Sequence, residues 1–211
     1  MDTKTQPQAI AEVMQRIHRA GTIDIRPEVA AHPWDFVAYH PDLAAVLPAV
    51  QAFCSAVLDD VRPKRWLSLL GPSGVGKTHV LKQALRFLGQ RMRIKTKTGW
   101  RGAEVAHINP LTDLGDWRAA ADYARYDLIY IEDIGAGGDA EAGAGRVVLS
   151  RLRELLQLRS GRWTMLDANL YRKRIAATLD GRIASRLKRD GSWMIEIPES
   201  VPDFWDVPKI K

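Results

Sequence analysis

The sequence predicts an α/β fold: a three-layer sandwich in which helices cover both faces of a central parallel sheet. Short apolar runs that suit buried strands alternate along the chain with amphipathic segments at helical spacing. Strands that alternate with helices form parallel sheets, and both faces of such sheets are covered. The chain has 211 residues, of which 46% are hydrophobic and 27% charged, and this suffices for one domain of ordinary composition.

The first 60 residues predict two helices joined by a linker. Apolar residues at helical spacing predict a helix over 8–20, and three prolines predict an ordered linker over 21–41. A second, more apolar helix is expected over 42–60. Asp42 suits its N-cap, and Pro48 is a point at which this helix could be interrupted.

The remainder of the chain alternates between strands and helices. Apolar runs of four or five residues predict buried strands at 66–70, 127–131, 163–167 and 193–197. Apolar residues at helical spacing predict helices between them, at 77–89, 110–124, 146–158 and 171–188. Gly99 and Gly102 predict a hairpin of two strands within 91–109, and the small residues of 138–145 predict a flexible loop.

We divide the chain into a short N-terminal helical arm with its linker, 1–40, and a main domain, 41–211. Residues 1–60 hold 4 Lys and Arg against 8 acidic residues, whereas the rest hold 27 against 17. A basic main domain favours a polyanionic partner, although a solvated basic surface explains the charge equally well. Cys54 is the only cysteine, so we expect no internal disulfide and a cytoplasmic protein. We find no apolar run near the ~18 residues of a membrane span and expect no membrane partner.

The clearest motif is a phosphate-binding loop. Its pattern is G-x-x-x-x-G-K-[ST], and it lies between an apolar strand and a helix, where backbone N–H groups can cradle phosphates. Lys77 can reach the β- and γ-phosphates, and Thr78 can ligate Mg²⁺. We therefore predict ATP and Mg²⁺ as cofactors. The residues of the loop are Gly71, Pro72, Ser73, Gly74, Val75, Gly76, Lys77 and Thr78.

An acidic pair follows the strand at 127–131. Glu132 and Asp133 stand where a buried parallel strand would end, which suits the metal and water of a phosphate-loop enzyme. We predict that Glu132 holds Mg²⁺ and that Asp133 orients or deprotonates the attacking water. The sequence has no Asn-Lys-x-Asp guanine signature, no Leu-Ser-Gly-Gly-Gln transporter signature and no protein-kinase signature set.

Residues 34–198, which hold these motifs, resemble an AAA+ ATPase of the initiator group, a class of P-loop NTPase. The resemblance is strongest to helicase loaders of DnaC type and to IstB-like ATP-binding proteins. Four blocks carry it: Gly71–Thr78, Leu128–Gly135, Thr164–Leu170 and Asp180–Leu187. It implies that Asn169 senses the γ-phosphate. It also implies that Arg182, with Arg186 as the second candidate, is an arginine finger offered to the ATP of a neighbouring subunit.

The same resemblance implies further features of the site. Residues Trp34 to Val37 are similar to the linker that covers the adenine, which makes Phe36 and Val37 cofactor-binding candidates; packing on the core is an equal alternative. The family resemblance also implies an ATP-dependent homo-oligomer and no C-terminal lid domain. One departure stands out, because the family usually has Asp-Asp or Asp-Glu where this chain has Glu132-Asp133. Slow hydrolysis, or a switch with little turnover, is therefore expected.

The predicted hairpin supplies candidate DNA contacts. Cations alternate with other residues, and a period of two places alternate side chains of a strand on one face. Trp100 adds an aromatic ring on which a base could stack. The alternative is an edge strand that uses cations to prevent aggregation. The candidates for contacts with single-stranded DNA are Arg91, Arg93, Lys95, Lys97 and Arg101.

These patterns together predict an ATP-binding and ATP-hydrolysing AAA+ protein of helicase-loader type that acts on DNA in replication. The expected partners are single-stranded DNA, further copies of the chain and a replicative helicase, which the helix at 8–20 would contact. An IstB-like transposition helper with a transposase partner is one alternative. A non-hydrolysing, ATP-dependent DNA-binding switch is another, and a small-molecule kinase is a more distant one.

Overall fold

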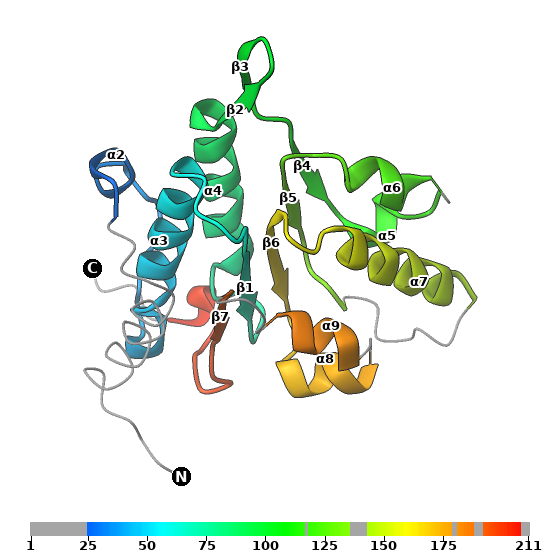
Figure 1. Ribbon diagram of the computed structural model, residues 1–211. Coiled ribbons are helices and arrows are strands. Elements are labelled where there is room, and N and C mark those ends of the chain that lie inside the picture. The colour runs from blue at the N-terminus through cyan, green and yellow to red at the C-terminus, as the bar shows by residue number, and fades with distance from the viewer. Residues whose placement is uncertain (1–24, 117, 136–142, 179–180, 188–191, 208–211) are drawn as a thin grey trace.

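The computed structural model describes residues 25–207, except for 117, 136–142, 179–180 and 188–191. Within these residues, five strands form a parallel sheet in the order β4-β5-β6-β1-β7 (Figure 1). The strands are β1 (Trp66–Leu70), β4 (Val105–Ile108), β5 (Leu128–Ile131), β6 (Trp163–Ala168) and β7 (Trp193–Glu196). The predicted parallel α/β architecture is confirmed.

Helices cover both faces of this sheet, as Figure 1 shows. Because successive side chains of a strand point to opposite faces, the sheet divides the core into two clusters. Leu67 and Leu69 of β1 lie in the first cluster with α3 (Val46–Leu58) and α4 (Lys77–Arg91). Trp66 and Leu70 lie in the second cluster with α6 (Ala119–Tyr123) and α7 (Gly143–Leu158). The shorter elements are α2 (Pro27–Ala30), η1 (Pro41–Leu43), α5 (Pro110–Asp113), α8 (Arg172–Thr178), α9 (Gly181–Arg186) and η3 (Phe204–Asp206).

The predicted hairpin is present as a separate two-stranded antiparallel sheet. Its strands are β2 (Arg93–Thr96) and β3 (Gly99–Gly102), and it projects beyond the end of α4 (Figure 1). The turn falls at Lys97 and Thr98. The last residues of the predicted range do not join the hairpin, because they form β4 at the edge of the main sheet.

The helix predicted over 42–60 begins later than expected. Asp42 lies inside η1 and is not the N-cap of a long helix, and α3 starts at Val46. Pro48 does not interrupt α3, because it lies in the first turn of the helix. A proline is tolerated there, since the backbone N–H groups of the first turn have no helical partner.

The segment Pro41–Leu58 corrects one further expectation. It is long and apolar enough to span a membrane by length and composition, with a mean hydropathy of 1.5. However, 61% of it is buried inside the fold, and α3 supplies many side chains of the first core cluster. Packing within the domain therefore accounts for its apolar composition.

Two predictions fall outside the described residues. The helix at 8–20 and most of the loop at 138–145 are in this position, so both stay predictions. The division at residue 40 also stays a prediction. The part of the linker that the structure describes does pack on the main domain, since Val29 is buried in the first cluster and the Arg26 backbone N–H donates to Ser55 Oγ at 3.0 Å.

A buried arginine joins the end of α7 to the sheet. Arg159 is fully buried, and its guanidinium donates hydrogen bonds to backbone carbonyls that precede β5 and to groups at the start of β6. Burial lowers the pKa of Arg159 to about 9. The acceptors are the carbonyl oxygens of Ala124, Tyr126, Asp127 and Trp163 and the hydroxyl of Thr164.

Candidate nucleotide-binding site

The phosphate-binding loop connects β1 to α4, as the motif requires. Gly76, the N-cap of α4, has a φ of 85°, a left-handed conformation that glycine adopts without strain. Lys77 and Thr78 are the first two residues of the 15-residue α4, whose N-terminus carries a positive partial charge. The predicted strand, loop and helix are all present in this order, which gives an anion-binding geometry.

The Lys77 ammonium lies inside this loop and is only 4% exposed. Its Nζ donates to the carbonyl oxygens of Gly71 at 3.0 Å and of Pro72 at 2.5 Å, and to Asn169 Oδ1 at 3.0 Å. Burial lowers the pKa of Lys77, and two nearby carboxylates oppose this shift. The side chain is thus held where a phosphate oxygen bound by the loop would meet it.

Asn169 links the lysine to the second residue of the acidic pair. Its Nδ2 donates to Asp133 Oδ1 at 2.7 Å, while its Oδ1 accepts from Lys77. Burial is the main cause that raises the pKa of Asp133, with a contribution from the Asp167 carboxylate. The structure therefore brings Lys77, Asp133 and Asn169 into one hydrogen-bonded chain at the carboxyl ends of β5 and β6.

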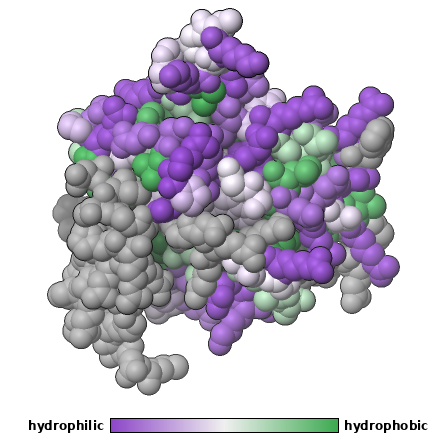
Figure 2. Space-filling model, in the orientation of Figure 1, coloured by the Kyte–Doolittle hydropathy of each residue, from purple (hydrophilic) through white to green (hydrophobic). Residues whose placement is uncertain are grey.

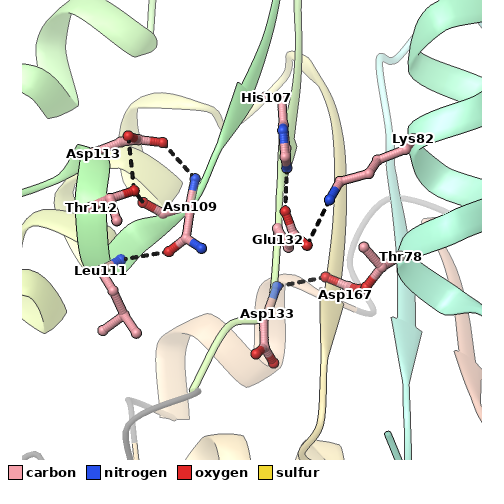
Figure 3. A network of polar contacts seen from close by, with 10 residues as sticks. All are labelled: Thr78, Lys82, His107, Asn109, Leu111, Thr112, Asp113, Glu132, Asp133 and Asp167. Carbon is pink, nitrogen blue, oxygen red and sulfur yellow. Dashed lines mark hydrogen bonds and ion pairs between the residues drawn. The ribbon is translucent and has the colours of Figure 1, made fainter. Parts of the chain in front are cut away.

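A carboxylate that the sequence analysis did not single out lies at the centre of this edge. Asp167, in β6, is 1% exposed and accepts from Thr78 Oγ1 at 2.5 Å and from the Asp133 backbone N–H at 2.6 Å. Figure 3 shows it between these two residues. The available signal was an acidic residue within an otherwise apolar strand, since a buried carboxylate needs partners.

The Glu132 carboxylate points toward α4 and β4. It lies between Lys82 Nζ, at 2.9 Å, and His107 Nε2, at 2.5 Å (Figure 3). The His107 ring in turn stacks on Tyr130, with ring centroids 5.0 Å apart and an interplanar angle of 8°. Among the described residues, the contacts of Glu132 thus go to α4 and β4 and not to Thr78, with which the sequence analysis grouped it as a metal ligand.

A cavity of about 360 Å³ opens beside the phosphate loop. Three segments line it, namely residues 35–39 of the linker, 74–79 of the loop and α4, and the aromatic pair 204–205 near the end of the described chain. Both predicted base-contacting residues, Phe36 and Val37, are among them. Trp34 instead packs on the core, where its Nε1 donates to the Val29 carbonyl at 2.9 Å.

The C-terminal wall of the cavity was not predicted from the sequence. The Phe204 backbone N–H donates to the Gly74 carbonyl at 3.2 Å, and the Phe204 ring lies 5.4 Å from that of Tyr39. Gly74 has a φ of 73°, and a Cβ at this position would lie 1.8 Å from Asp203 Oδ2. Only glycine fits where the C-terminal segment crosses the loop.

The predicted finger Arg182 lies on α9 and is exposed. The helix is anchored by Ile183 and Ala184, which are buried in the second core cluster. The side chain of Arg186, the second candidate, lies outside the described residues. A role of Arg182 at a neighbouring subunit stays a prediction.

The structure separates the five predicted DNA-contacting cations. Arg91 is not on the strand, since it ends α4 with its guanidinium 4.4 Å from the centroid of the Phe87 ring. Arg93 and Lys95 are exposed on β2, and Lys97 lies in the turn. Arg93 also donates to the carbonyls of two residues at the end of α4. Figure 2 shows hydrophilic residues over this projecting hairpin.

Arg101, the fifth cation, is already engaged. Its two terminal nitrogens lie 2.7 Å and 3.1 Å from the carboxylate oxygens of Asp127, a bidentate ion pair between β3 and the residue before β5. The hydrogen bond to Asp127 raises the pKa of Arg101. This pair holds the base of the hairpin against the main domain.

The parallel sheet, the phosphate loop and the polar side chains at the strand ends form an α/β fold that is similar to the AAA+ P-loop domains of DnaA and DnaI. No protein-family model and no curated protein sequence matches the chain. The fold is similar to a structure of the replication initiator DnaA bound to AMPPCP and single-stranded DNA, with a TM-score of 0.56 and 15% identity over 82% of this chain.

Two further solved structures have the same fold. One is domain III of the Thermotoga maritima replication initiation protein DnaA, with a TM-score of 0.51 and 16% identity over 83% of this chain and 69% of that one. The other is DnaI, with a TM-score of 0.52 and 17% identity over 88% of this chain and 98% of that one. The chain spans about half the length of the first DnaA structure. At these identities the likeness establishes the fold.

Proposed function

We propose that this protein is a cytoplasmic AAA+ ATPase of helicase-loader type that acts on DNA in replication. The observation that carries the proposal is the hydrogen-bonded chain from Lys77 through Asn169 to Asp133, which lies directly at the phosphate-binding loop. The fold adds support, because the similarity to DnaI extends over almost all of that chain.

Each of the hydrogen-bonded residues Lys77, Asn169 and Asp133 has a role in the proposed reaction. The backbone N–H groups of residues 71–78 and the Lys77 ammonium bind the β- and γ-phosphates. Asn169 contacts the γ-phosphate with its amide, and Asp133 orients the attacking water. Because Asn169 bonds both Lys77 and Asp133, a γ-phosphate that shifts the asparagine also shifts the water-orienting carboxylate.

Mg²⁺ suits the oxygen-rich end of the site. Threonine hydroxyl oxygen is a ligand that this hard cation accepts, and Thr78 would supply it, held by its hydrogen bond to the Asp167 carboxylate. When bound, the ion would supply positive charge that neutralises the negative charge developing on the phosphates.

The cavity beside the loop suits an adenine base. Phe36 and Val37 form one wall, and Phe204 and Trp205 another, so a purine ring could stack between apolar surfaces. Trp205 is 75% exposed and Val37 62% exposed, which leaves their apolar surface available for a ligand to cover. The cavity volume lies at the lower end of the range for small-molecule sites.

The proposed DNA partner rests on two observations. The DnaA structure of similar fold is bound to single-stranded DNA, and the hairpin presents exposed cations together with Trp100, which is 69% exposed. Cations bind phosphates without regard to sequence, and an exposed indole ring can stack on any base. A replicative helicase and further copies of the chain complete the proposed set of partners. An IstB-like transposition helper with a transposase partner is the alternative.

One feature favours a second function, an ATP-dependent DNA-binding switch with little turnover. Glu132 is held by Lys82 and His107, and Asp133 has one methylene fewer than the glutamate that often orients water in this family. Slow hydrolysis with intact ATP binding follows if the Asp133 carboxylate lies too far from the water.

The test is ATP affinity and steady-state ATP hydrolysis, each with and without single-stranded DNA. We expect micromolar ATP binding that is lost in Lys77→Ala, and hydrolysis that DNA stimulates. Lys64→Ala, which removes a partly buried lysine that pairs with Asp60, is the matched control and should bind ATP normally. ATP-dependent DNA binding without hydrolysis favours the switch, and an absence of ATP binding in the unaltered protein overturns the proposal.

A further inference from the structure

The metal end of the site has an arrangement that the sequence did not indicate. We infer that Asp167 of β6, and not Glu132, which follows β5, is the carboxylate that orients Thr78 toward the Mg²⁺ ion of bound ATP. The inference rests on the proposed function, and it assigns the metal side of that same site. It makes Asp167 a positioning residue that acts through Thr78.

The direction of one hydrogen bond carries the argument. A hydroxyl that ligates a cation must offer an oxygen lone pair to it, so its proton has to be donated to another acceptor. Thr78 Oγ1 donates to Asp167 Oδ2 at 2.5 Å. Asp167 therefore accepts the hydrogen bond of the Thr78 hydroxyl, and a lone pair of Oγ1 is left to face a cation.

The second oxygen of Asp167 fixes the rest of the site. Oδ1 accepts from the Asp133 backbone N–H at 2.6 Å, and the Asp167 backbone carbonyl accepts from the Ile134 N–H at 2.9 Å. Asp133 has a φ of 51°, an uncommon conformation for a residue other than glycine, which these two bonds help to hold. One buried carboxylate thus places Thr78 and the turn that carries the water-orienting acid.

The charge of Asp167 is only partly compensated. It is 1% exposed, and within the described part of the chain no Lys, Arg or His nitrogen forms a direct ion pair with it. Burial lowers the pKa of Lys77, and the Lys77 ammonium is close enough for the Asp167 carboxylate to oppose this shift. Burying a carboxylate is costly, and a divalent cation beside Thr78 would add to the compensation that Lys77 provides.

Glu132 is in the opposite situation. Two basic side chains lie against its two carboxylate oxygens, Lys82 at 2.9 Å and His107 at 2.5 Å. Turning Glu132 toward Thr78 would break both contacts and separate its charge from that of Lys82. Figure 3 shows the two carboxylates as separate centres, one facing Lys82 and His107 and the other facing Thr78.

The experiment measures ATP affinity in the presence of Mg²⁺ and in EDTA, for Asp167→Asn and for Glu132→Gln as the matched control. The readout is the ratio of the two dissociation constants, which does not depend on turnover. We expect Mg²⁺ to tighten ATP binding by at least about tenfold in the unaltered protein and in Glu132→Gln, a difference of about 1.4 kcal/mol. In Asp167→Asn we expect a ratio near one, with affinity in EDTA unchanged.

The opposite pattern, with the Mg²⁺ effect lost in Glu132→Gln and kept in Asp167→Asn, would overturn the inference while leaving ATP binding intact.

Circular dichroism checks that each variant folds. Thr78→Ala supplies a second route if Asp167→Asn does not fold. We expect Thr78→Ala alone to lose the Mg²⁺ effect on ATP affinity. Adding Glu132→Gln to Thr78→Ala should leave the dissociation constant for ATP unchanged, both in EDTA and in Mg²⁺. A Thr78→Ala variant that keeps the Mg²⁺ effect contradicts the inference, and an unaltered protein without ATP binding overturns it together with the proposed function.

Discussion

Asn169 joins the two halves of the candidate site, because it bonds Lys77 through its oxygen and Asp133 through its nitrogen. We predict that Asn169→Ala slows ATP hydrolysis on the order of a hundredfold, as for removal of one preorganised donor. ATP affinity should change little, since the loop and Lys77 still bind the phosphates. Single-turnover hydrolysis and equilibrium ATP binding, measured side by side, check this.

A second asparagine serves as the control for that prediction. Asn109 follows β4, and its side chain caps α5 by accepting from the Leu111 backbone N–H at 3.0 Å. Asn109→Ala should cost about 1 kcal/mol of unfolding free energy, as for loss of a helix cap, and leave hydrolysis unchanged. Equal rates in Asn169→Ala and Asn109→Ala would argue against a link through Asn169.

At the residue scale, the sequence could predict side chains that a motif places by spacing along the chain. Lys77 and Thr78 are of this kind, whereas Asn169 was implied by the family resemblance, and all three lie together in the structure. An acidic residue within an apolar strand was an available signal for Asp167, but its partners could not be predicted, because they depend on β6 lying between β1 and β5. Nor did the order of Glu132 and its neighbour reveal that Glu132 faces two basic side chains from α4 and β4.

At the element scale, Arg159 fastens α7 to the sheet. We predict that Arg159→Met lowers the free energy of unfolding by about 3–5 kcal/mol, because the acceptors of a buried guanidinium are left unpaired. Methionine fills similar space, so the loss comes mainly from the missing hydrogen bonds. Urea denaturation followed by circular dichroism measures it.

Arg146, exposed on the same helix, gives the matched control. Arg146→Met should change the unfolding free energy by no more than about 0.5 kcal/mol, as for an ordinary surface substitution. If both variants were equally stable, the buried guanidinium would contribute nothing net to stability.

The hairpin carries a separate prediction about DNA. Lys95 and Lys97 lie on β2 and in the turn, whereas Arg93 also bonds the end of α4 and Arg101 pairs with Asp127. We predict that the double variant Lys95→Ala/Lys97→Ala binds single-stranded DNA more weakly. The slope of log affinity against log salt should fall by about 1.4, since each phosphate contact to a single strand contributes about 0.7.

Fluorescence anisotropy with a labelled oligonucleotide across a salt series measures this slope. The control is Arg125→Ala/Arg146→Ala, which removes the same net charge from exposed positions outside the hairpin. If both double variants lowered the slope equally, net charge and not the hairpin would account for DNA binding.

Strand positions were predictable from apolar runs, and element boundaries were less so. β1 matches its predicted range, because five buried residues are followed at once by the glycine of the loop. α4 extends past its predicted end to Arg91, whose guanidinium packs on Phe87 one turn earlier. Side chains four apart on a helix are neighbours, and this local contact favours helix at Arg91. Arg91 therefore ends α4 and does not belong to the strand in which the sequence pattern placed it.

At the scale of the whole molecule, the site is assembled from segments far apart in the chain. The linker at 35–39, the loop at 71–78, the ends of β5 and β6, and the aromatic pair 204–205 all meet there. Segments near both ends of the described chain therefore line the cavity beside the phosphate loop. Nothing in the sequence indicated the contact between the C-terminal segment and Gly74, because it depends on the complete sheet being formed.

We propose that Arg182 extends this assembly to a second copy of the chain. We predict that Arg182→Ala binds ATP normally but hydrolyses it at least about tenfold more slowly, since arginine fingers contribute to rate and not to binding. Lys77→Ala should also be inactive while keeping its finger. A 1:1 mixture of the two should then recover about a quarter of normal ATPase activity, because random head-to-tail assembly pairs an intact loop with an intact finger at that frequency. Mixing Arg182→Ala with the Lys77→Ala/Arg182→Ala double variant supplies no finger and should recover none. A 1:1 mixture no more active than the mean of its components would mean that Arg182 does not act across subunits.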